Sequence, residues 1–213
     1  MNRPLPQRMY LLGCAVDGDR PVIAAARFRG ELMRAAALAE LSLRGLVTYR
    51  RGKAAGVPGT SVDDPFLASV LRYAPADRPR RWVSLISHDA HTAEAFVRGQ
   101  LAEAGAVSVD PRNPLQGAEV LVRDREAVRG LRNEVRDAVI GGRDVAELPV
   151  DRLLTAVLAA EAEVDTVLTL SERWTHRKRL KSLAAHVEPV APGLTIALRT
   201  ANATARSYNG GWS

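Results

Sequence analysis

The chain has 213 residues, 46% of them hydrophobic, which is enough for one domain with a sizeable core. Its 30 Lys and Arg residues against 24 Asp and Glu give a net charge of +6, which favours anionic partners. A single cysteine, Cys14, excludes a disulfide framework and fits a reducing compartment. No run approaches the roughly 18 apolar residues of a membrane span, so we expect a cytoplasmic protein whose membrane contacts are peripheral.

Arginine and alanine dominate the composition, and lysine occurs only at positions 53, 178 and 181. This bias is typical of a high-GC bacterial genome, so the basic charge is weak evidence for nucleic acid binding. Aromatic residues make up only 5% of the chain, so the core must be aliphatic and rich in alanine. Such a core favours closely packed helices.

The N-terminal part begins with a short apolar run, 9–16, which we interpret as a strand. Asp17 and Gly18 then form a turn signal, and 22–26 is expected to return as the second strand of a hairpin. The stretch ELMRAAALAELSLRG follows, and its spacing predicts a helix over 31–44 that is apolar on most of its circumference. Such a helix is usually central.

Charged residues on this expected central helix need partners. Glu40 precedes Arg44 by four residues, the favourable orientation for a helical ion pair. Arg34 meets Leu38 at the next turn, and its nearest carboxylate on the helix is Glu31, one turn back. Arg34 is therefore the cation whose charge a ligand can use. Gly45 is expected to end the helix in a left-handed conformation.

The middle of the chain predicts short elements separated by loops. Asp64 and Pro65 are typical of a helix start, as N-cap and first helical residue. The predicted elements are a strand at 46–50, a loop at 51–60, helices within DDPFLASVLRYA and RPRRWVSLIS, a helix at 90–104, and a second hairpin made of AVSV, the turn DPRNPLQG and AEVLV.

The C-terminal part predicts three further helices, over 123–140, 150–168 and 171–186. Residues 208–213 are expected to form a mobile tail after a domain that covers 1–207. The fold class is therefore mainly α: a single helical globular domain with a central apolar helix bundle, amphipathic helices around it and two small β-hairpins.

Motifs that carry chemistry are few. His88 and His91, with Asp89 and Glu94 nearby, could seed a metal site on one helical turn, but a second cluster is missing. The sequence contains no GxSxG motif, no P-loop and no evident pair of carboxylates. Cys14 lies in an apolar pattern and reads as a small hydrophobe. We expect a non-enzymatic protein without metal or cofactor.

The densest basic run is RWTHRKRLK. Arg173, Arg177 and Lys181 share one face of the predicted helix and can meet phosphates, or else form a solvated face near a helix C-terminus. A winged helix that binds nucleic acid is a further alternative, because a helix followed by a hairpin mimics that motif. The candidate recognition helix, however, contains Glu94, Glu103 and only one arginine, so no nucleic acid partner is expected.

Several of these motifs occur in one order along the chain: the short LL segment, AELSLRG, DDPFL, RRWVSLIS, LAEAGAV with a hairpin, DRLLTAVLAAEAEVDTVL and RKRLKSL. In this order they resemble the Golgi phosphoprotein 3 family, in its bacterial branch. The resemblance covers residues 5 to 205, and AELSLRG is its most specific piece. It implies a mostly α-helical globule.

The eukaryotic members of this family are peripheral membrane adaptors that bind phosphatidylinositol 4-phosphate in a basic pocket and hold glycosyltransferases in the Golgi. By the resemblance, the pocket arginine is Arg34, and the pocket tryptophan is replaced by Ala25. Two basic positions of the pocket fall on His91 and Glu94, and Arg98 is a candidate substitute for the second. The membrane-touching hairpin of the family would present Leu115 as its apolar residue.

We therefore expect an anionic phospholipid-binding adaptor at the inner face of the plasma membrane, with a headgroup site at Arg34, His91 and Arg98. The expected partners are phospholipid headgroups and cytosolic tails of membrane proteins, and an oligomer is compatible with the sequence. The alternative is a protein–protein interaction scaffold that has lost lipid binding. The winged-helix alternative ranks third.

Overall fold

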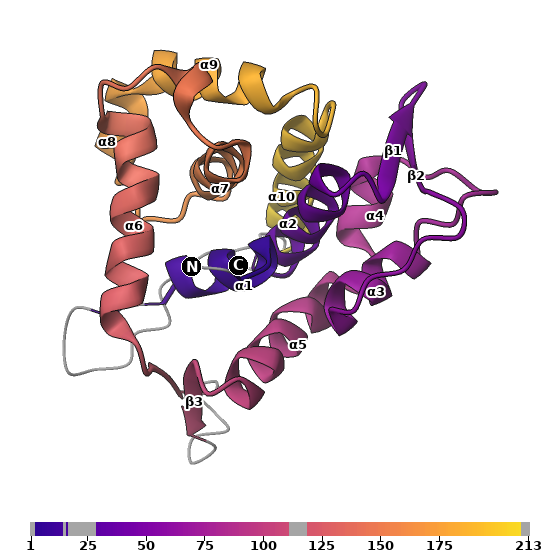
Figure 1. Ribbon diagram of the computed structural model, residues 1–213, viewed down its shortest axis with the longest axis horizontal. Helices are drawn as coiled ribbons and strands as arrows, with labels where there is room; N and C mark the ends of the chain where they lie inside the picture. Colours follow the sequence, from indigo (N-terminus) through magenta and orange to yellow (C-terminus); the bar gives the residue numbers. More distant parts are fainter. Residues whose placement is uncertain (1–2, 15, 17–28, 111–118, 210–213) are drawn as a thin grey trace.

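The computed structural model describes residues 3–14, 16, 29–110 and 119–209 (Figure 1). This part of the chain is mainly α-helical and contains two antiparallel two-stranded sheets, which confirms the expected fold class. The elements are α1 Leu5–Leu12, α2 Arg29–Leu43, β1 Val47–Arg50, β2 Lys53–Gly56, α3 Pro65–Arg72, α4 Trp82–Ser87, α5 Ala90–Glu103, β3 Val107–Asp110, β4 Glu119–Val122, α6 Arg125–Ile140, the 3₁₀ turn Val145–Glu147, α7 Val150–Glu161, α8 Leu170–Thr175, α9 Arg177–Val187 and α10 Leu194–Asn209.

Helix α2 is the central helix that the sequence predicts. It lies among α1, α4, α5, α7 and α10 (Figure 1), and its residues from Leu32 to Leu41 are all buried. The alanines at 35, 36, 37 and 39 are fully buried and let neighbouring helices approach closely. At Gly30 the approach is closest, since a Cβ there would lie 1.9 Å from the carbonyl oxygen of Ala90 on α5.

The carboxylate of Glu40 links this central helix to the start of α1. Its Oε2 accepts a hydrogen bond from the backbone N–H of Leu5 at 3.0 Å, and its Oε1 lies 2.6 Å from Arg44 Nη2. The first N–H groups of a helix have no partner within that helix, and Pro4 offers α1 no side-chain cap. Glu40 supplies that cap, and its predicted pairing with Arg44 is confirmed.

The strand expected at 9–16 is wrong, because Leu5–Leu12 form helix α1. All eight of its residues are buried, including Gln7 and Arg8. A short apolar run has no polar face that reveals its period, so a buried helix and a buried strand look alike in sequence. The returning strand expected at 22–26 lies outside the described residues.

The first hairpin of the structure falls at β1 and β2 instead, where a strand and a loop were expected. Val47 pairs with Gly56 and Arg50 with Lys53, around a two-residue turn at Arg51 and Gly52. Both turn residues have positive φ, 50° and 80°, as a tight hairpin turn of this type requires. The second hairpin is confirmed by β3 and β4, whereas its turn, with Leu115, lies outside the described residues.

Two boundaries in the C-terminal half differ from expectation. Helix α7 ends at Glu161 rather than at 168, and Glu163 turns the chain with a left-handed φ of 55°. The helix expected over 171–186 is two helices, α8 and α9, because the backbone of His176 leaves the helical conformation (φ −95°, ψ 17°). Helix α10 was not expected, and it includes residues 208 and 209 of the predicted tail.

None of the described helices combines the length and apolar character that crossing a bilayer requires. Residues 210–213 lie outside the described part of the chain, so the division into a domain and a tail stays a prediction.

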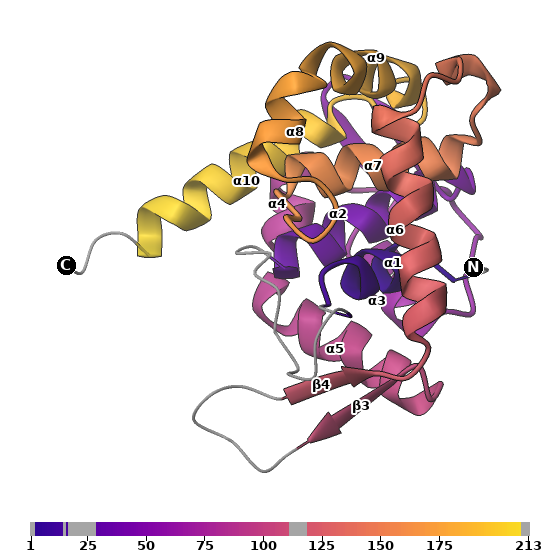
Figure 2. The same ribbon diagram turned by 90° about the vertical axis from the view of Figure 1, so that its left-hand side faces the viewer.

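Figure 2 shows α8 and α9 at one end of the molecule and the β3–β4 hairpin at the other.

The close approach of α2 and α5 predicts that Gly30→Ala destabilises the fold. The added methyl group would collide with the Ala90 carbonyl, and overpacking of this kind costs about 1–3 kcal/mol of unfolding free energy. The matched control is Gly99→Ala on α5, where the added Cβ meets nothing within 4 Å and alanine should stabilise the helix by up to about 1 kcal/mol. Urea unfolding of the two variants checks the prediction; equal effects would contradict it.

Candidate anion-binding site around Arg34

Arg34 lies under the turn between α4 and α5. The residue is only 3% exposed, and its Nε donates a hydrogen bond to the carbonyl oxygen of Leu85 at 2.7 Å. Its Nη2 is buried and has no hydrogen-bond partner among the described residues. A buried donor without a partner is costly, and the cost is larger on a charged group. The position therefore has a cationic donor that an anion would satisfy.

The ring of Tyr73, just after α3, organises the groups next to Arg34. The Arg80 guanidinium carbon lies 4.2 Å from the ring centroid, and Arg80 Nη1 donates to the Tyr73 hydroxyl at 3.0 Å. His88 stacks on the same ring with centroids 3.3 Å apart, and the Arg34 guanidinium carbon lies 5.9 Å from the ring centroid. Two arginines and a histidine thus surround one aromatic ring.

The α4–α5 turn adds one carboxylate to this cluster. Asp89 has a left-handed backbone (φ 47°), and one of its oxygens lies 3.1 Å from His88 Nε2. Its side chain is 61% exposed, so its charge is largely screened by solvent. The charge balance of the cluster, made up of Arg34, Tyr73, Arg80, His88 and Asp89, is therefore positive, and this set is called the Arg34 cluster below.

Two pKa shifts follow from this packing. Burial lowers the pKa of the Arg34 guanidinium, and the nearby Asp89 opposes that shift. An arginine nevertheless stays charged at neutral pH. Partial burial also lowers the pKa of His88 below its ordinary value of 6.5; Asp89 opposes this shift, whereas Arg34 and Arg80 add to it. His88 is therefore mainly neutral at pH 7.

The structure does not gather the other predicted headgroup residues around Arg34. His91 is exposed on the first turn of α5, and no hydrogen bond or ion pair joins it to Arg34 within the described residues. Arg98 lies two turns further along α5 and acts electrostatically on Tyr10 of α1. The roles of His91 and Arg98 stay predictions, and Ala25 lies outside the described residues.

Glu94 is neutralised by a residue that the sequence analysis did not single out. Its Oε1 lies 3.0 Å from Nη1 of Arg29, at the start of α2, and Arg29 Nη2 also donates to the carbonyl oxygen of Gly13 at 3.0 Å. The Glu94 carboxylate is therefore compensated by a cation on the neighbouring helix. The repulsion that Glu94 would exert on an anion is weakened accordingly.

The predicted secondary basic face is divided between two helices. Arg173 belongs to α8 and is engaged by Asp165 at 2.9 Å and by the carbonyl oxygen of Leu168 at 2.7 Å. Arg177 and Lys181 lie on α9 and are exposed. Arg173 therefore serves the internal structure of this corner, and the accessible cations are the two on α9.

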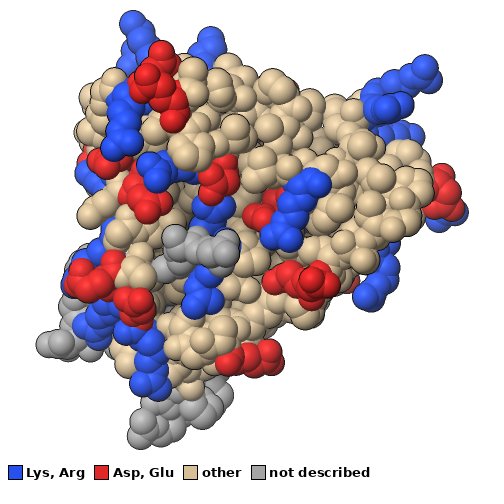
Figure 3. Space-filling view, viewed as in Figure 1, with Lys and Arg blue, Asp and Glu red and all other residues tan. Residues whose placement is uncertain are grey.

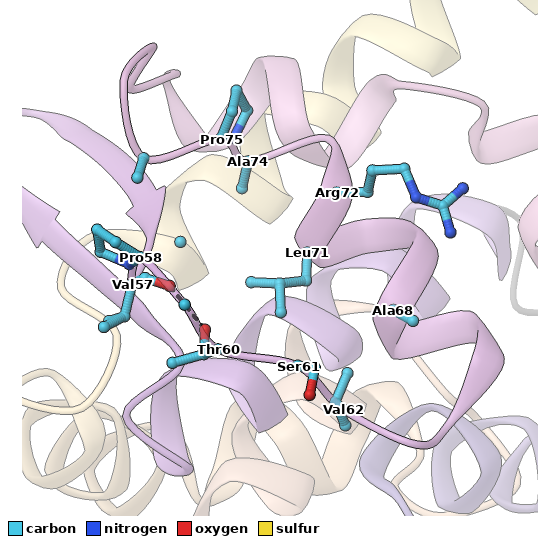
Figure 4. A pocket seen from close by; sticks show the side chains of 13 residues that line it. Val57, Pro58, Thr60, Ser61, Val62, Ala68, Leu71, Arg72, Ala74 and Pro75 are labelled. Carbon is cyan, nitrogen blue, oxygen red and sulfur yellow. Dashed lines mark hydrogen bonds between the residues drawn. The ribbon is translucent and has the colours of Figure 1, made fainter.

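The two described cavities do not contain the predicted site residues. One, of about 420 Å³, lies between the end of β2 and α3 (Figure 4); Leu71 points into it, whereas Arg72 points away. Its walls are mostly small and apolar, which does not suit a phosphate. The other, of about 430 Å³, lies between α1, α6 and β4, and its charged lining residues are Arg3, Asp124 and Glu134.

The other two candidates for chemistry were the Cys14 thiol and a metal site. Burial raises the pKa of the Cys14 thiol to about 11, and its Sγ donates to the Tyr10 carbonyl oxygen at 3.4 Å. The thiol therefore stays protonated at neutral pH. Among the described residues, no three His, Cys, Asp or Glu side chains come together as a metal site requires.

Sequence reasoning singled out Arg34 but not the residues that surround it. No local spacing connects the other cluster residues: Tyr73 directly follows α3, Arg80 lies in the segment before α4, and His88 lies in the α4–α5 turn. The only signal was the concentration of basic residues in RPRRW, which gives no partner for them. Their proximity depends on how α3 and α4 pack on α2.

The lowered pKa of His88 predicts acid sensitivity. In the unfolded chain His88 binds a proton near pH 6.5, whereas in the folded protein it resists protonation. The neutral form therefore contributes stability above pH 6.5, and this contribution is lost as the pH falls through the folded pKa. Between pH 7.5 and pH 5.5, the unfolding free energy measured in urea should fall by less in His88→Gln than in the wild type. An equal fall in unfolding free energy for both proteins, together with an NMR titration that gives His88 its ordinary pKa, would refute this prediction.

Comparison with known proteins assigns the family. The family model described as Golgi phosphoprotein 3 (GPP34) matches residues 5–201, nearly the whole chain. A search of curated protein sequences found no match. The matched range starts at α1 and ends within α10, so it includes the central helix, both hairpins and the Arg34 cluster. The chain therefore belongs to the Golgi phosphoprotein 3 family.

Proposed function

We propose that this protein is a non-enzymatic peripheral adaptor, which attaches to anionic phospholipid surfaces by binding a phosphate headgroup at the Arg34 cluster. Phosphatidylinositol 4-phosphate, or a phospholipid of similar headgroup chemistry, is the ligand class that family membership suggests. Attachment would place the protein at the inner face of the plasma membrane, where the cytosolic tails of membrane proteins are its proposed clients.

The observation that carries this proposal is the Nη2 group of Arg34. It is a buried cationic donor without a partner among the described residues, next to the aromatic ring of Tyr73 and a second guanidinium, that of Arg80. Phosphate oxygens form short, charge-assisted hydrogen bonds with guanidinium groups, often two at a time. A structural ion pair would have placed a carboxylate on Nη2, and the described residues place none there.

Surface charge alone supports the proposal less well. On the face shown in Figure 3, acidic and basic side chains are interspersed over the left-hand side and the centre, with neither sign gathered into a separate area. The net charge of +6 is thus not gathered into one basic patch on this face. Specific headgroup binding therefore has to come from a local cluster rather than from diffuse attraction.

The second candidate function is a protein–protein interaction scaffold without lipid binding. Two features favour it: by the resemblance to the family, Ala25 stands in place of the pocket tryptophan and Glu94 in place of a basic pocket residue, and Glu94 pairs with Arg29. In this case Arg34 would serve only to fasten α2 to the carbonyl of Leu85.

Vesicle co-sedimentation distinguishes the two candidates. Neutral vesicles, phosphatidylserine vesicles and vesicles doped with phosphatidylinositol 4-phosphate are compared, the two anionic sets being matched in total charge. We expect tighter binding to the doped vesicles than to the charge-matched phosphatidylserine vesicles. Arg34→Gln should weaken binding to the doped vesicles by about tenfold, because the charge-assisted hydrogen bonds from one guanidinium are removed. Glutamine keeps a donor for the Leu85 carbonyl.

The matched control is Arg50→Gln, which removes the same charge from an exposed position on β1. It should bind as the wild type does. Circular dichroism of both variants shows whether the fold is intact. Selective binding that Arg34→Gln leaves unchanged would exclude the Arg34 cluster as the headgroup site. No binding to any vesicle would favour the scaffold.

A further inference from the structure

Helix α8 exposes its large apolar side chains instead of burying them. Leu170 and Trp174 are four residues apart, on one side of the helix, and they are 74% and 70% exposed. No residue of α8 is buried. A single exposed leucine is ordinary, but a tryptophan and a leucine side by side on a short helix form an apolar surface that solvent disfavours.

The exposure is built into the fold, because α8 is firmly held on its other side. Thr169 and Glu172 form a capping box at its start. Glu172 also pairs with Arg136 of α6 at 2.5 Å, and this contact lowers the pKa of Glu172 to about 2. Arg173 pairs with Asp165 at 2.9 Å. These contacts fix which way Leu170 and Trp174 point.

Cations without carboxylate partners border this apolar surface. The guanidinium carbon of Arg177 lies 4.9 Å from the ring centroid of Trp174. Lys178 follows Arg177 on α9, Lys181 lies one turn further along, and both are exposed. The chain has no Asp or Glu from position 173 to 187. Within the described residues, none of these three cations forms an ion pair, in contrast to Arg173.

We propose that Leu170, Trp174, Arg177, Lys178 and Lys181, together the α8–α9 corner, form a second membrane-contact site that inserts into the interface of an anionic bilayer. Tryptophan prefers the boundary between headgroups and acyl chains, and neighbouring cations add attraction to anionic lipids. This inference rests on the proposed peripheral attachment, but it concerns a different surface and does not require the Arg34 cluster.

A lipid surface fits this corner better than a second copy of the chain. A stable protein interface buries roughly 800 Å² on each partner, over some 20 residues, and two apolar side chains supply only a small part of that. Self-association would also bring two sets of unpaired cations together, and like charges in an interface are unfavourable. An anionic membrane offers the opposite charge without needing a matching shape.

The corner is remote from the hairpin that family members use to touch the membrane. In Figures 1 and 2, α8 and α9 lie at the end of the molecule opposite to strands β3 and β4. The contribution of the corner can therefore be measured separately from that of the hairpin and of Arg34.

Tryptophan fluorescence reports directly on insertion. The chain has three tryptophans: Trp82 is buried and donates to the carbonyl oxygen of Pro192 at 2.8 Å, and Trp212 can be replaced by phenylalanine. In the Trp212→Phe protein, Trp174 is then the accessible fluorophore. With phosphatidylserine vesicles we expect a blue shift and quenching by brominated acyl chains. Both effects should be lost in the further variant Trp174→Phe.

Two matched pairs of variants test the energetics by co-sedimentation. Leu170→Ser with Trp174→Ser removes the apolar part, and Ile196→Ser, at another exposed apolar residue, is its control. A second variant removes three charges by changing Arg177, Lys178 and Lys181 to Gln. Its control changes three exposed cations of the β1–β2 hairpin, Arg50, Arg51 and Lys53, to Gln. Each corner variant should weaken binding by about tenfold or more, and its control much less.

The outcomes separate this inference from the proposed function. Binding that persists without quenching of Trp174, and with corner variants no weaker than their controls, overturns the corner and leaves the headgroup site standing. Quenching in phosphatidylserine vesicles that Arg34→Gln leaves unchanged supports the corner and shows that it inserts without the Arg34 cluster. If the wild type binds no anionic vesicle, both are refuted, and a concentration-dependent mass in solution would assign the apolar surface to a second copy.

Discussion

The fold depends on a helix that is buried on all sides, α2. Helices can surround it because the four buried alanines at 35, 36, 37 and 39 leave room for neighbours and because Gly30 lets α5 approach to contact distance. Such a helix has no solvent-facing side, so each of its charged residues needs a partner on another element. Glu40 meets this need by capping the first N–H of α1 and pairing with Arg44. The carboxylate thus fastens α2 to α1 and gives α1 the cap that Pro4 cannot supply.

Arg34 meets the same need only in part. One of its nitrogens is satisfied by the Leu85 carbonyl, and another is left without a partner among the described residues. A core built for stability alone would have an apolar residue at this position, since a buried, incompletely paired charge is unfavourable. The cation is retained beside the ring of Tyr73 and the guanidinium of Arg80. This arrangement is the basis for the anion site that we propose at Arg34.

The two proposed contacts with a membrane use different physics. The Arg34 cluster offers directional hydrogen bonds from a guanidinium that burial has already desolvated, and this favours selection among headgroups. The α8–α9 corner offers an exposed tryptophan beside unpaired cations, and this favours any anionic interface. Neither contact alone has to be strong, because two contacts made by one rigid body raise each other's effective concentration when both can reach the same surface.

Local signals in the sequence determined the central helix, its left-handed end at Gly45, the start of α3 at Asp64 and the second hairpin, and they also gave the family. Each of these depends on a residue type whose backbone preference or cap acts within a few positions. The tertiary structure alone decided that the first apolar run is a helix, because burial on every side erases the pattern that distinguishes helix from strand. It also decided the partners of Glu94 and the surroundings of Arg34, since these side chains come from segments far apart in the chain. The tertiary structure alone also decided that Trp174 is exposed, because the sequence shows an apolar residue but not whether other residues cover it.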